Sequence, residues 1–371
     1  MRKVRSSLGR LKRRTLGHSE PGYRLPRPDV SAAHPGLTKP LLIACRPGFD
    51  QDLPGSGALI RLGLAHGWAQ ACGPAKLVPV AELLLAIDRQ PERPAVMMSE
   101  FEFIYLRKSE AKRLREVDLF VWVGIHPSLF GELRKHVPLT NHDELDLQKE
   151  AYSMILTAEP KFVFNSVGQG GAAWFQGWRD DGLKWETIWH AANPERYFPE
   201  PSPQQFGHIK MAYVGGYWAE KAQGYELYLR PWENILVTYG NQSWPYKGYA
   251  GQLDEEGERQ LYSTAEIIPL VTGPFGWMMA ELTERYFKTP ACRAFCIADH
   301  NPALREVFSE HEMLQAQSPE HFHELIRDYL DGKIDAKNWA ERGYRAVQER
   351  HLYKHRALQI KTALEKVRRE T

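Results

Sequence analysis

Short apolar runs alternate with helical segments twice along the chain, and this alternation restricts the protein to a small set of folds. The first series lies within residues 37–195 and the second within residues 206–350. Between them, "NPERYFPEPSPQQ" has three prolines in its last seven residues, which is typical of a connection between domains. Strands that alternate with helices form parallel, doubly wound sheets. The sequence therefore predicts two α/β domains, and 371 residues are enough for both.

The expected strands are short apolar runs that end at glycine, proline or a charged residue. Among the helices, "EHFHELIRDYL" (320–330) has a clear apolar stripe at helical spacing. The strand candidates are 40–48, 76–87, 94–103, 117–125 and 161–167 in the first half, and 210–216, 234–240, 265–273, 293–300 and 312–316 in the second.

Three strand candidates of the second half end in glycine, the third of them at Thr272-Gly273. The first ends at Gly215-Gly216 and the next at Tyr239-Gly240. Ligands of doubly wound sheets bind beyond the carboxyl ends of the strands, and glycine lets a ligand come close to the backbone there. None of these ends is a GxGxxG or Walker loop, so the sequence gives no support for a dinucleotide cofactor or ATP. We expect an anionic ligand in a cleft between the domains.

The stretch "ELTERYFK" has two interpretations that spacing alone leaves open. In a continuous helix, Glu281 faces Arg285 and Glu284 faces Lys288, and these pairs belong to a solvated surface. If instead the helix begins at Thr283, the two cations lie in its first two turns, where they oppose the helix dipole. An anionic ligand would compensate for that arrangement.

Several segments of the second half occur in a recognisable order: "YVGGYWAEK", "ILVTYGNQSW", "ERYFKTPACRAFCIADHNPALREVF" and "WAERGYRAVQERHLYKHR". Over roughly residues 190–360 the chain resembles the C-terminal domain of CgeB-type glycosyltransferases. The resemblance implies a GT-B fold, which has two doubly wound Rossmann-like domains around a cleft. Residues 37–195 would then form the acceptor-side domain, 206–350 the donor domain, and 351–371 a C-terminal crossover helix that returns to the first domain.

The resemblance also implies an activity, the transfer of a hexosyl or related sugar from a nucleotide-sugar donor to a glycan or other hydroxyl acceptor. The nucleotide sugar is a co-substrate, and no cofactor is implied. Gly215 and Gly216 would form the loop beneath the donor diphosphate. Lys221 and Arg285 would contact its phosphates.

Four further positions belong to the comparison, and two of them, Lys288 and Arg293, depart from the family pattern. Tyr239 and Gly240 would lie beside the nucleobase. Lys288 stands where many relatives have a glutamate that holds the donor ribose, and Glu284 is the candidate substitute. Arg293 stands where the family has glycine.

The expected catalytic residues are His126, Asp50 and Glu284. Because no metal is expected, fixed cations must stabilise the departing diphosphate, and the candidates are Lys221, Arg285 and Lys288. His126 follows the strand "FVWVGI" and is a candidate base, or else a histidine bonded to a nearby carbonyl. Glu100 and Glu102 occupy comparable places after another strand.

Asp50 and Asp52 form a DxD triplet, which with a divalent metal marks GT-A glycosyltransferases. The triplet follows the first strand, whereas GT-A enzymes have it deeper in the domain. Two doubly wound halves also disagree with a single GT-A domain. We therefore expect no metal site.

The N-terminus is strongly basic. Residues 1–15 contain seven Lys or Arg and no acid, although the net charge of the whole chain is only +2. Such an arm in a tail and linker (1–36) suits an anionic membrane surface or a solvated tail. It lacks the interleaved aromatic residues of nucleic-acid-binding arms. No apolar run approaches the ~18 residues of a membrane span, no secretory signal is present, and the four cysteines are scattered. We expect a cytoplasmic protein, peripheral at the inner membrane face.

Two other functions remain open. A sugar-nucleotide epimerase shares the expected fold but relies on acidic residues and histidines around the cleft. A binding protein that has lost catalysis would account for Lys288 and Arg293.

Overall fold

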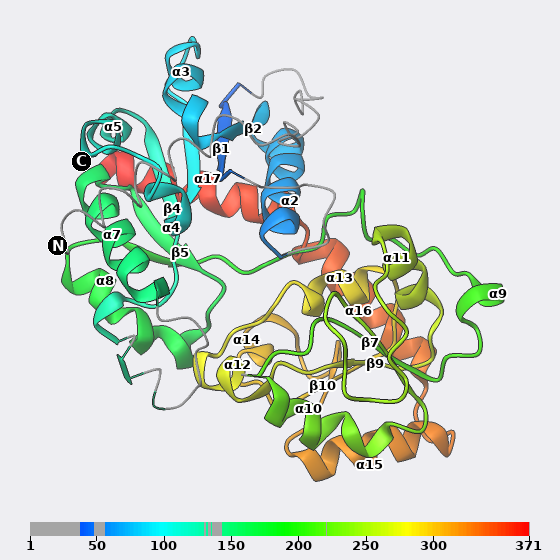
Figure 1. The fold of residues 1–371 in the computed structure, drawn as a ribbon. Coiled ribbons are helices and arrows are strands. Elements are labelled where there is room, and N and C mark those ends of the chain that lie inside the picture. The colour runs from blue at the N-terminus through cyan, green and yellow to red at the C-terminus, as the bar shows by residue number, and fades with distance from the viewer. Residues whose placement is uncertain are drawn as a thin grey trace.

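Two α/β domains, one after the other in the chain, make up the computed structural model (Figure 1). The N-terminal domain lies at the upper left of Figure 1 and the C-terminal domain at the lower right. The structure describes residues 38–47, 56–129, 131–132, 135, 143–219 and 221–370. The predictions for the basic tail and for Asp50 lie outside these ranges.

The N-terminal domain is built on a six-stranded sheet in the order β2-β1-β3-β4-β5-β6. All neighbouring strands are parallel, and Ile43 of β1 lies opposite Leu77 of β2 and Met97 of β3. The central strands are buried on both faces, as in sheets covered by helices on both sides. The strands are β1 (Leu41–Cys45), β2 (Ala75–Pro79), β3 (Ala95–Ser99), β4 (Asp118–Trp122), β5 (Phe162–Asn165) and β6 (Trp185–Thr187).

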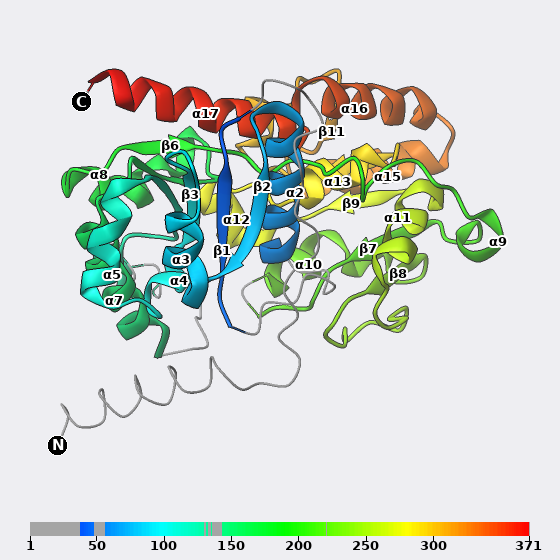
Figure 2. The ribbon, with the colours of Figure 1, turned by 90° about the horizontal axis from the view of Figure 1, so that it is seen from above.

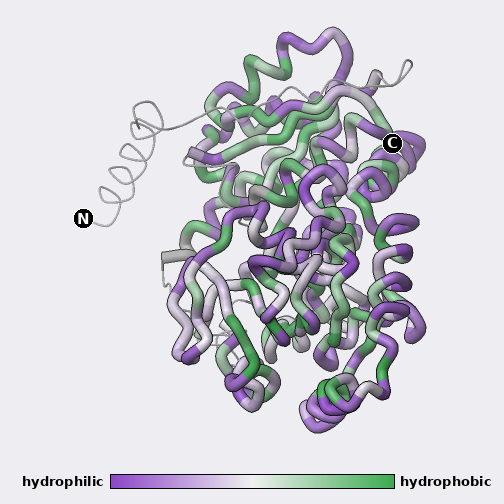
Figure 3. Tube along the Cα trace, turned by 90° about the vertical axis from the view of Figure 1, so that its right-hand side faces the viewer, coloured by the Kyte–Doolittle hydropathy of each residue, from purple (hydrophilic) through white to green (hydrophobic). Residues whose placement is uncertain are grey.

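Helices connect these strands and cover both faces of the sheet. In Figure 3 the strands of this domain are mostly apolar, whereas the outer turns of the helices are polar. The predicted strand 76–87 is wrong in its second half, because its Leu- and Ala-rich part forms a helix after β2. The helices are α2 (Ser56–Ala71), α3 (Leu83–Asp88), α4 (Glu100–Phe103), α5 (Lys108–Arg113), α7 (Asp143–Ala158) and α8 (Gln176–Asp180).

The C-terminal domain has a second parallel sheet in two parts, β8-β7 and β9-β10-β11. A single parallel bridge between Met211 and Ile267 joins the parts. Each strand lies inside a predicted run, because the apolar residues continue beyond the hydrogen-bonded ladder. The strands are β7 (Met211–Val214), β8 (Leu236–Tyr239), β9 (Ile268–Leu270), β10 (Cys296–Ala298) and β11 (Leu314–Gln315).

The helices of this domain again lie between the strands. Helix α15 (Pro319–Leu330) contains the predicted stripe of residues 320–330: Phe322 and Ile326 are buried, and the Ser318 side chain accepts a hydrogen bond from the backbone N–H of His321 at its start. A short helix, α9 (Pro203–Phe206), lies on the proline-rich connection. The others are α10 (Ala222–Tyr228), α11 (Glu255–Thr264), α12 (Gly273–Met279), α13 (Arg285–Ala291), α14 (Leu304–Val307), α15 (Pro319–Leu330) and α16 (Ala336–Arg350).

The last helix, α17 (Tyr353–Glu370), returns from α16 to the N-terminal domain (Figure 2). Its apolar face, including Ile360, shares a buried core with α2. Gly63 and Gly67 of α2 permit this contact, because a Cβ at either position would overlap Tyr353. At its far end, Arg368 forms an ion pair with the buried Asp118 of β4.

The connection between the domains is hydrogen-bonded to the chain at the start of α17. The Ala192 N–H donates to His351 O at 2.9 Å, and the Tyr353 N–H donates to Ala192 O at 3.1 Å. The buried guanidinium of Arg356 donates to the carbonyl oxygens of Trp189 and His190. The two segments in which the chain passes between the domains are therefore hydrogen-bonded to each other. Within the described ranges, no helix is both long and apolar enough to span a membrane.

Candidate functional site

A cavity of ≈ 420 Å³ opens at the carboxyl ends of β7 and β8. Its size lies in the range of small-molecule sites. The loop after β7, the start of α10, one residue of α11 and the start of α13 supply its wall. The lining residues that bear charge are Lys221, Glu258, Glu284, Arg285 and Lys288.

Three glycines form the backbone part of this wall. The Gly215 N–H donates to Tyr239 O at 2.8 Å, which holds the loop after β7 against the end of β8. A Cβ on Gly240 would overlap the Gly215 carbonyl, and one on Gly216 would lie 2.8 Å from Trp218 Nε1. Gly240 is therefore required by close backbone packing, and glycine at all three positions leaves the loop accessible to a ligand.

Arg285 lies at the base of the cavity and is 93% buried. Its Nε donates to Val214 O at 3.1 Å and its Nη1 donates to the Tyr213 hydroxyl at 2.8 Å. The guanidinium also lies 4.4 Å from the centre of the Tyr213 ring. Nη2 lies 2.6 Å from where a Gly215 Cβ would be, so this nitrogen faces the glycine loop. One hydrogen bond to a backbone carbonyl and one to a side-chain hydroxyl thus hold Arg285 in a fixed orientation toward the cavity.

The structure decides between the two interpretations of "ELTERYFK". Helix α13 begins at Arg285 with Glu284 at its N-cap, close to the expected Thr283. Arg285 and Lys288 are both buried. The surface interpretation is therefore wrong, and the expected pair of Glu281 with Arg285 is replaced by the contacts to Tyr213 and Val214.

Lys288 is not a free cation. Its Nζ lies 2.6 Å from Glu258 Oε1 and 3.9 Å from Glu284 Oε1. Glu258 also accepts hydrogen bonds from the hydroxyls of Tyr197 (2.9 Å) and Tyr262 (2.6 Å). Lys288 therefore lines the cavity, but its charge is already paired with Glu258.

Glu284 lines the same cavity as a carboxylate. Burial raises its pKa, but the positive charges of Lys288 and Arg285 outweigh burial and hold the pKa at about 2. Among the described residues, no other side chain is hydrogen-bonded to Glu284, and its carboxylate lines the cavity.

Of the remaining donor-site candidates, some line the cavity and others do not. Lys221 caps the start of α10 and lines the cavity, as does Gly240. The Tyr239 side chain lies in the hydrophobic core, so only its carbonyl serves the site. The departure at Arg293 has a structural consequence: this residue has φ 57°, a conformation that favours glycine, and its guanidinium packs 4.4 Å from the centre of the Tyr344 ring.

The structure does not bring His126 into this cavity. Its Nε2 pairs with Asp181 Oδ2 at 3.0 Å, and its Nδ1 bonds the Ser128 hydroxyl at 2.6 Å. The ring is held edge-on against Tyr152 and Trp178. Both nitrogens are therefore occupied, by side chains rather than by the backbone carbonyl that the sequence suggested as the alternative.

The two glutamates after β3 differ from each other. Glu102 is buried and pairs with Arg61 at 2.7 Å. Glu100 is also buried but accepts from the Gly124 N–H at 3.1 Å without a basic partner in the described part of the chain. Among the described residues, no group of three or more His, Cys, Asp or Glu side chains is placed to hold a metal; Asp50 and Asp52 lie outside them.

Sequence reasoning missed Glu258 and Trp218. Glu258 occurs in "EEGERQLY", which looks like a solvated charged segment. The available signal was its spacing, because Glu258 precedes Leu261 and Tyr262 by three and four residues and shares their buried face. Trp218 lies on the cavity rim and is 41% exposed.

The C-terminal part of the chain matches a known family model. Residues 221–362 match the family model described as glycosyl transferase-like. No curated protein matches the sequence. Because the family match starts at Lys221 and includes α13, it covers most of the charged wall of the cavity.

Solved structures resemble the whole chain. Sucrose-phosphate synthase from Thermosynechococcus elongatus has a TM-score of 0.57 at 13% identity, covering 90% of this chain and 100% of that one. Anabaena Alr3699/HepE in complex with UDP and glucose has a TM-score of 0.58 at 12% identity, covering 88% and 100%. T4 phage BGT in complex with UDP and Mn²⁺ has a TM-score of 0.53 at 10% identity, covering 88% and 99%.

At such identities the similarity establishes the fold, and it confirms the expected pair of doubly wound domains. The chain has the GT-B fold, and its residues 221–362 match the family model described as glycosyl transferase-like.

Proposed function

We propose that this protein transfers a sugar from a nucleotide-sugar donor to a hydroxyl group of a glycan or other acceptor. The observation that carries the proposal is the cavity that Lys221 lines and in which the Gly215-Gly216 loop faces the fixed guanidinium of Arg285. The motif order that resembles CgeB-type enzymes and the UDP complexes of the structural neighbours are consistent with it.

In this proposal the glycine loop and the two cations hold the donor diphosphate. When the bond from the sugar to the diphosphate breaks, negative charge accumulates on the leaving group. Fixed cations in a site that excludes water stabilise this charge more than mobile solvent does. Arg285 and Lys221 would supply this stabilisation without a metal or another cofactor.

Glu284, rather than Lys288, would hold the ribose hydroxyls. Its carboxylate is ionised and lines the cavity, while Lys288 is already paired with Glu258. The role of Lys288 would then be to keep Glu284 charged. Gly240 would lie beside the nucleobase.

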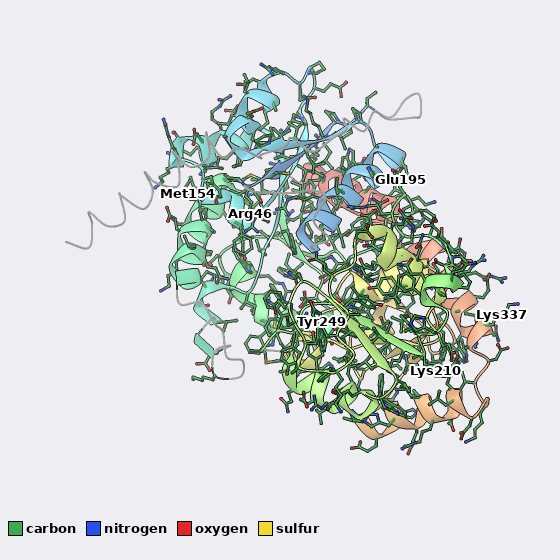
Figure 4. The ribbon with its side chains drawn as sticks, turned by 45° about the vertical axis from the view of Figure 1, so that its right-hand side comes forward. Arg46, Met154, Glu195, Lys210, Tyr249 and Lys337 are labelled. Atoms are coloured by element: carbon green, nitrogen blue, oxygen red, sulfur yellow. The ribbon has the colours of Figure 1, made fainter. Side chains whose placement is uncertain are left out.

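The proposed donor is tested by thermal-shift screening with UDP-, GDP- and CMP-sugars. One nucleotide class should stabilise the wild type, and Lys221→Ala should reduce that shift because it removes a cation from the cavity. The matched control is Lys210→Ala, which removes an exposed lysine just before β7, at the opposite end from the glycine loop (Figure 4). Absence of a shift at millimolar ligand contradicts the proposal.

The activity is tested by product analysis. Slow release of the nucleoside diphosphate without acceptor supports a transferase. Conversion of the free nucleotide sugar into an isomer would instead identify an epimerase, and binding without turnover a protein that has lost catalysis.

We also propose a cytoplasmic location at the inner membrane face, supported by the seven basic residues in 1–15. Full-length protein should sediment with vesicles that contain phosphatidylserine, and less so in high salt. Protein that lacks residues 1–15 should not. Equal sedimentation of both forms would refute this location.

A further inference from the structure

The N-terminal sheet reverses its winding direction between β1 and β3. From β1 the chain continues to the edge strand β2, and from β3 it continues in the other direction to β6. At such a point the loops after the two strands leave toward opposite faces, and a crevice opens at their carboxyl ends. Glu100 is the first residue after β3 and therefore lies at this crevice.

A buried ion pair closes the base of the crevice. Arg61 of α2 donates to Glu102 Oε1 at 2.7 Å, to the Ser99 hydroxyl at 3.0 Å and to Ala44 O at 3.2 Å. The Ser99 N–H donates to Glu102 Oε2 at 2.6 Å. These bonds tie α2 to the end of β3, so Glu102 has a structural role.

Glu100 has no such partners. It is 93% buried, and its Oε2 accepts from the Gly124 N–H at 3.1 Å, while no described residue bonds to its Oε1. Burial raises its pKa to about 7, the Gly124 hydrogen bond opposes this, and the charge of Glu102 adds to it. A carboxyl group of this kind exchanges a proton near neutral pH.

Charged groups from the neighbouring elements are engaged elsewhere. Arg61 of α2 bonds to Glu102, and Tyr152 of α7 bonds to Asp181, as does His126 from the loop after β4. Arg46, after β1, lies 5.8 Å from the centre of the Phe101 ring, which is 43% exposed. The Phe101 side chain next to Glu100 therefore reaches the surface.

The edge of the sheet that carries Glu100 contacts the segment just before α13, whose first residue Arg285 lines the donor cavity. Val167, just after β5, forms an antiparallel bridge with Glu281, and the Gly168 N–H donates to Ala280 O at 2.9 Å. Glu281 precedes Arg285 by four residues. Because parallel strands lie about 4.8 Å apart, β3 is about 10 Å from β5 along this edge. In Figure 4, Arg46 and Tyr249 lie on the sides of the two domains that face each other.

We propose that Glu100 is the general base of the reaction, an inference that rests on the proposed transferase function. Its Oε1 takes the proton of the acceptor hydroxyl as the acceptor oxygen bonds to the anomeric carbon of the donor sugar. The bond from that carbon to the diphosphate oxygen breaks, and its electron pair leaves with the diphosphate. With water as acceptor, the same step hydrolyses the donor.

Glu100→Gln tests this role, because glutamine keeps the shape and can still accept from Gly124 but cannot take the proton. The matched control is Glu82→Gln, an exposed carboxylate of the same domain. For the nucleotide sugar that stabilises the wild type most, kcat for release of nucleoside diphosphate should fall by about 10²- to 10⁴-fold in Glu100→Gln. Its Tm and its donor-induced thermal shift should stay as in the wild type, and Glu82→Gln should match the wild type throughout.

The pH profile separates a base from a residue that only shapes the site. In the wild type and in Glu82→Gln, kcat/KM should rise with pH through an apparent pKa near 7, and Glu100→Gln should lose this dependence. Turnover above a tenth of the wild-type value in a folded Glu100→Gln, or an unchanged pH profile, overturns the assignment alone. A wild type that neither binds nor cleaves any nucleotide sugar overturns the proposed function as well.

Discussion

Replacing Lys288 by methionine should destabilise the C-terminal domain strongly. Lys288 is 93% buried and neutralises Glu258 at 2.6 Å and Glu284 at 3.9 Å. Methionine fills a similar volume but leaves both carboxylates buried without their cation. Removing one partner of a buried ion pair costs about 3–5 kcal/mol. The shift in the pKa of Glu284 is consistent with that range, since a change from 4.5 to about 2 corresponds to roughly 3 kcal/mol of the free energy of unfolding.

The chain contains a matched control in Lys333. Its Nζ lies 2.9 Å from Asp328 and 3.0 Å from Asp331, but its side chain is 61% exposed. Both lysines thus have two acidic neighbours and differ chiefly in burial. Because exposed ion pairs contribute little, Lys333→Met should leave the unfolding midpoint almost unchanged. Urea unfolding at pH 7, followed by tryptophan fluorescence, measures both variants. Equal effects of the two replacements would refute the reasoning.

The pH dependence gives a second readout of the same variant. The folded-state pKa of Glu284 is lowered, so its contribution to stability is full above about pH 4.5 and is lost as the pH falls toward 2. A protonated Glu284 does not need the lysine. The difference in stability between the wild type and Lys288→Met should therefore shrink between pH 5 and pH 3. A difference that stays constant or grows over that range would contradict this account of Glu284.

Two further changes test the supports of the site. Asp118→Ala should cost about 1.5–3 kcal/mol in urea unfolding and make α17 susceptible to limited proteolysis, because the buried carboxylate accepts hydrogen bonds from Lys39 and Arg368; unchanged protection of α17 would contradict this. Gly240→Ala should abolish the thermal shift caused by nucleotide sugars, because its Cβ would overlap the Gly215 carbonyl and displace the glycine loop; an unchanged shift would show that this loop is not part of the donor site.

The alternation of strands and helices made both sheets predictable, because buried parallel strands are short, continuous apolar runs. The glycine-ended strands predicted the position of the cavity, because ligands of such sheets bind beyond the carboxyl ends of the strands. The charged residues were harder to place. A hydrophilic segment such as "EEGERQLY" gives no sign that Glu258 turns inward, and only the contacts across the fold show that Lys288 pairs with it.

The N-terminal candidates illustrate a different limit. His126 and Glu100 both follow strands, and their sequence contexts do not distinguish them. The structure does so through long-range contacts, because Asp181 lies 55 residues from His126 and occupies its Nε2, whereas Glu100 keeps one oxygen without a described partner. Tyr239 differs for a related reason: its side chain completes the core, so only its backbone reaches the donor site.

The most direct test of the donor site is a crystal structure of the protein with the nucleotide sugar that gives the largest thermal shift. Our account predicts the diphosphate within hydrogen-bonding distance of Arg285 Nη2 and of the Gly216 N–H, with Lys221 beside it and Glu284 facing the ribose. A nucleotide bound elsewhere, or a diphosphate that does not contact the Gly215-Gly216 loop, would contradict the account.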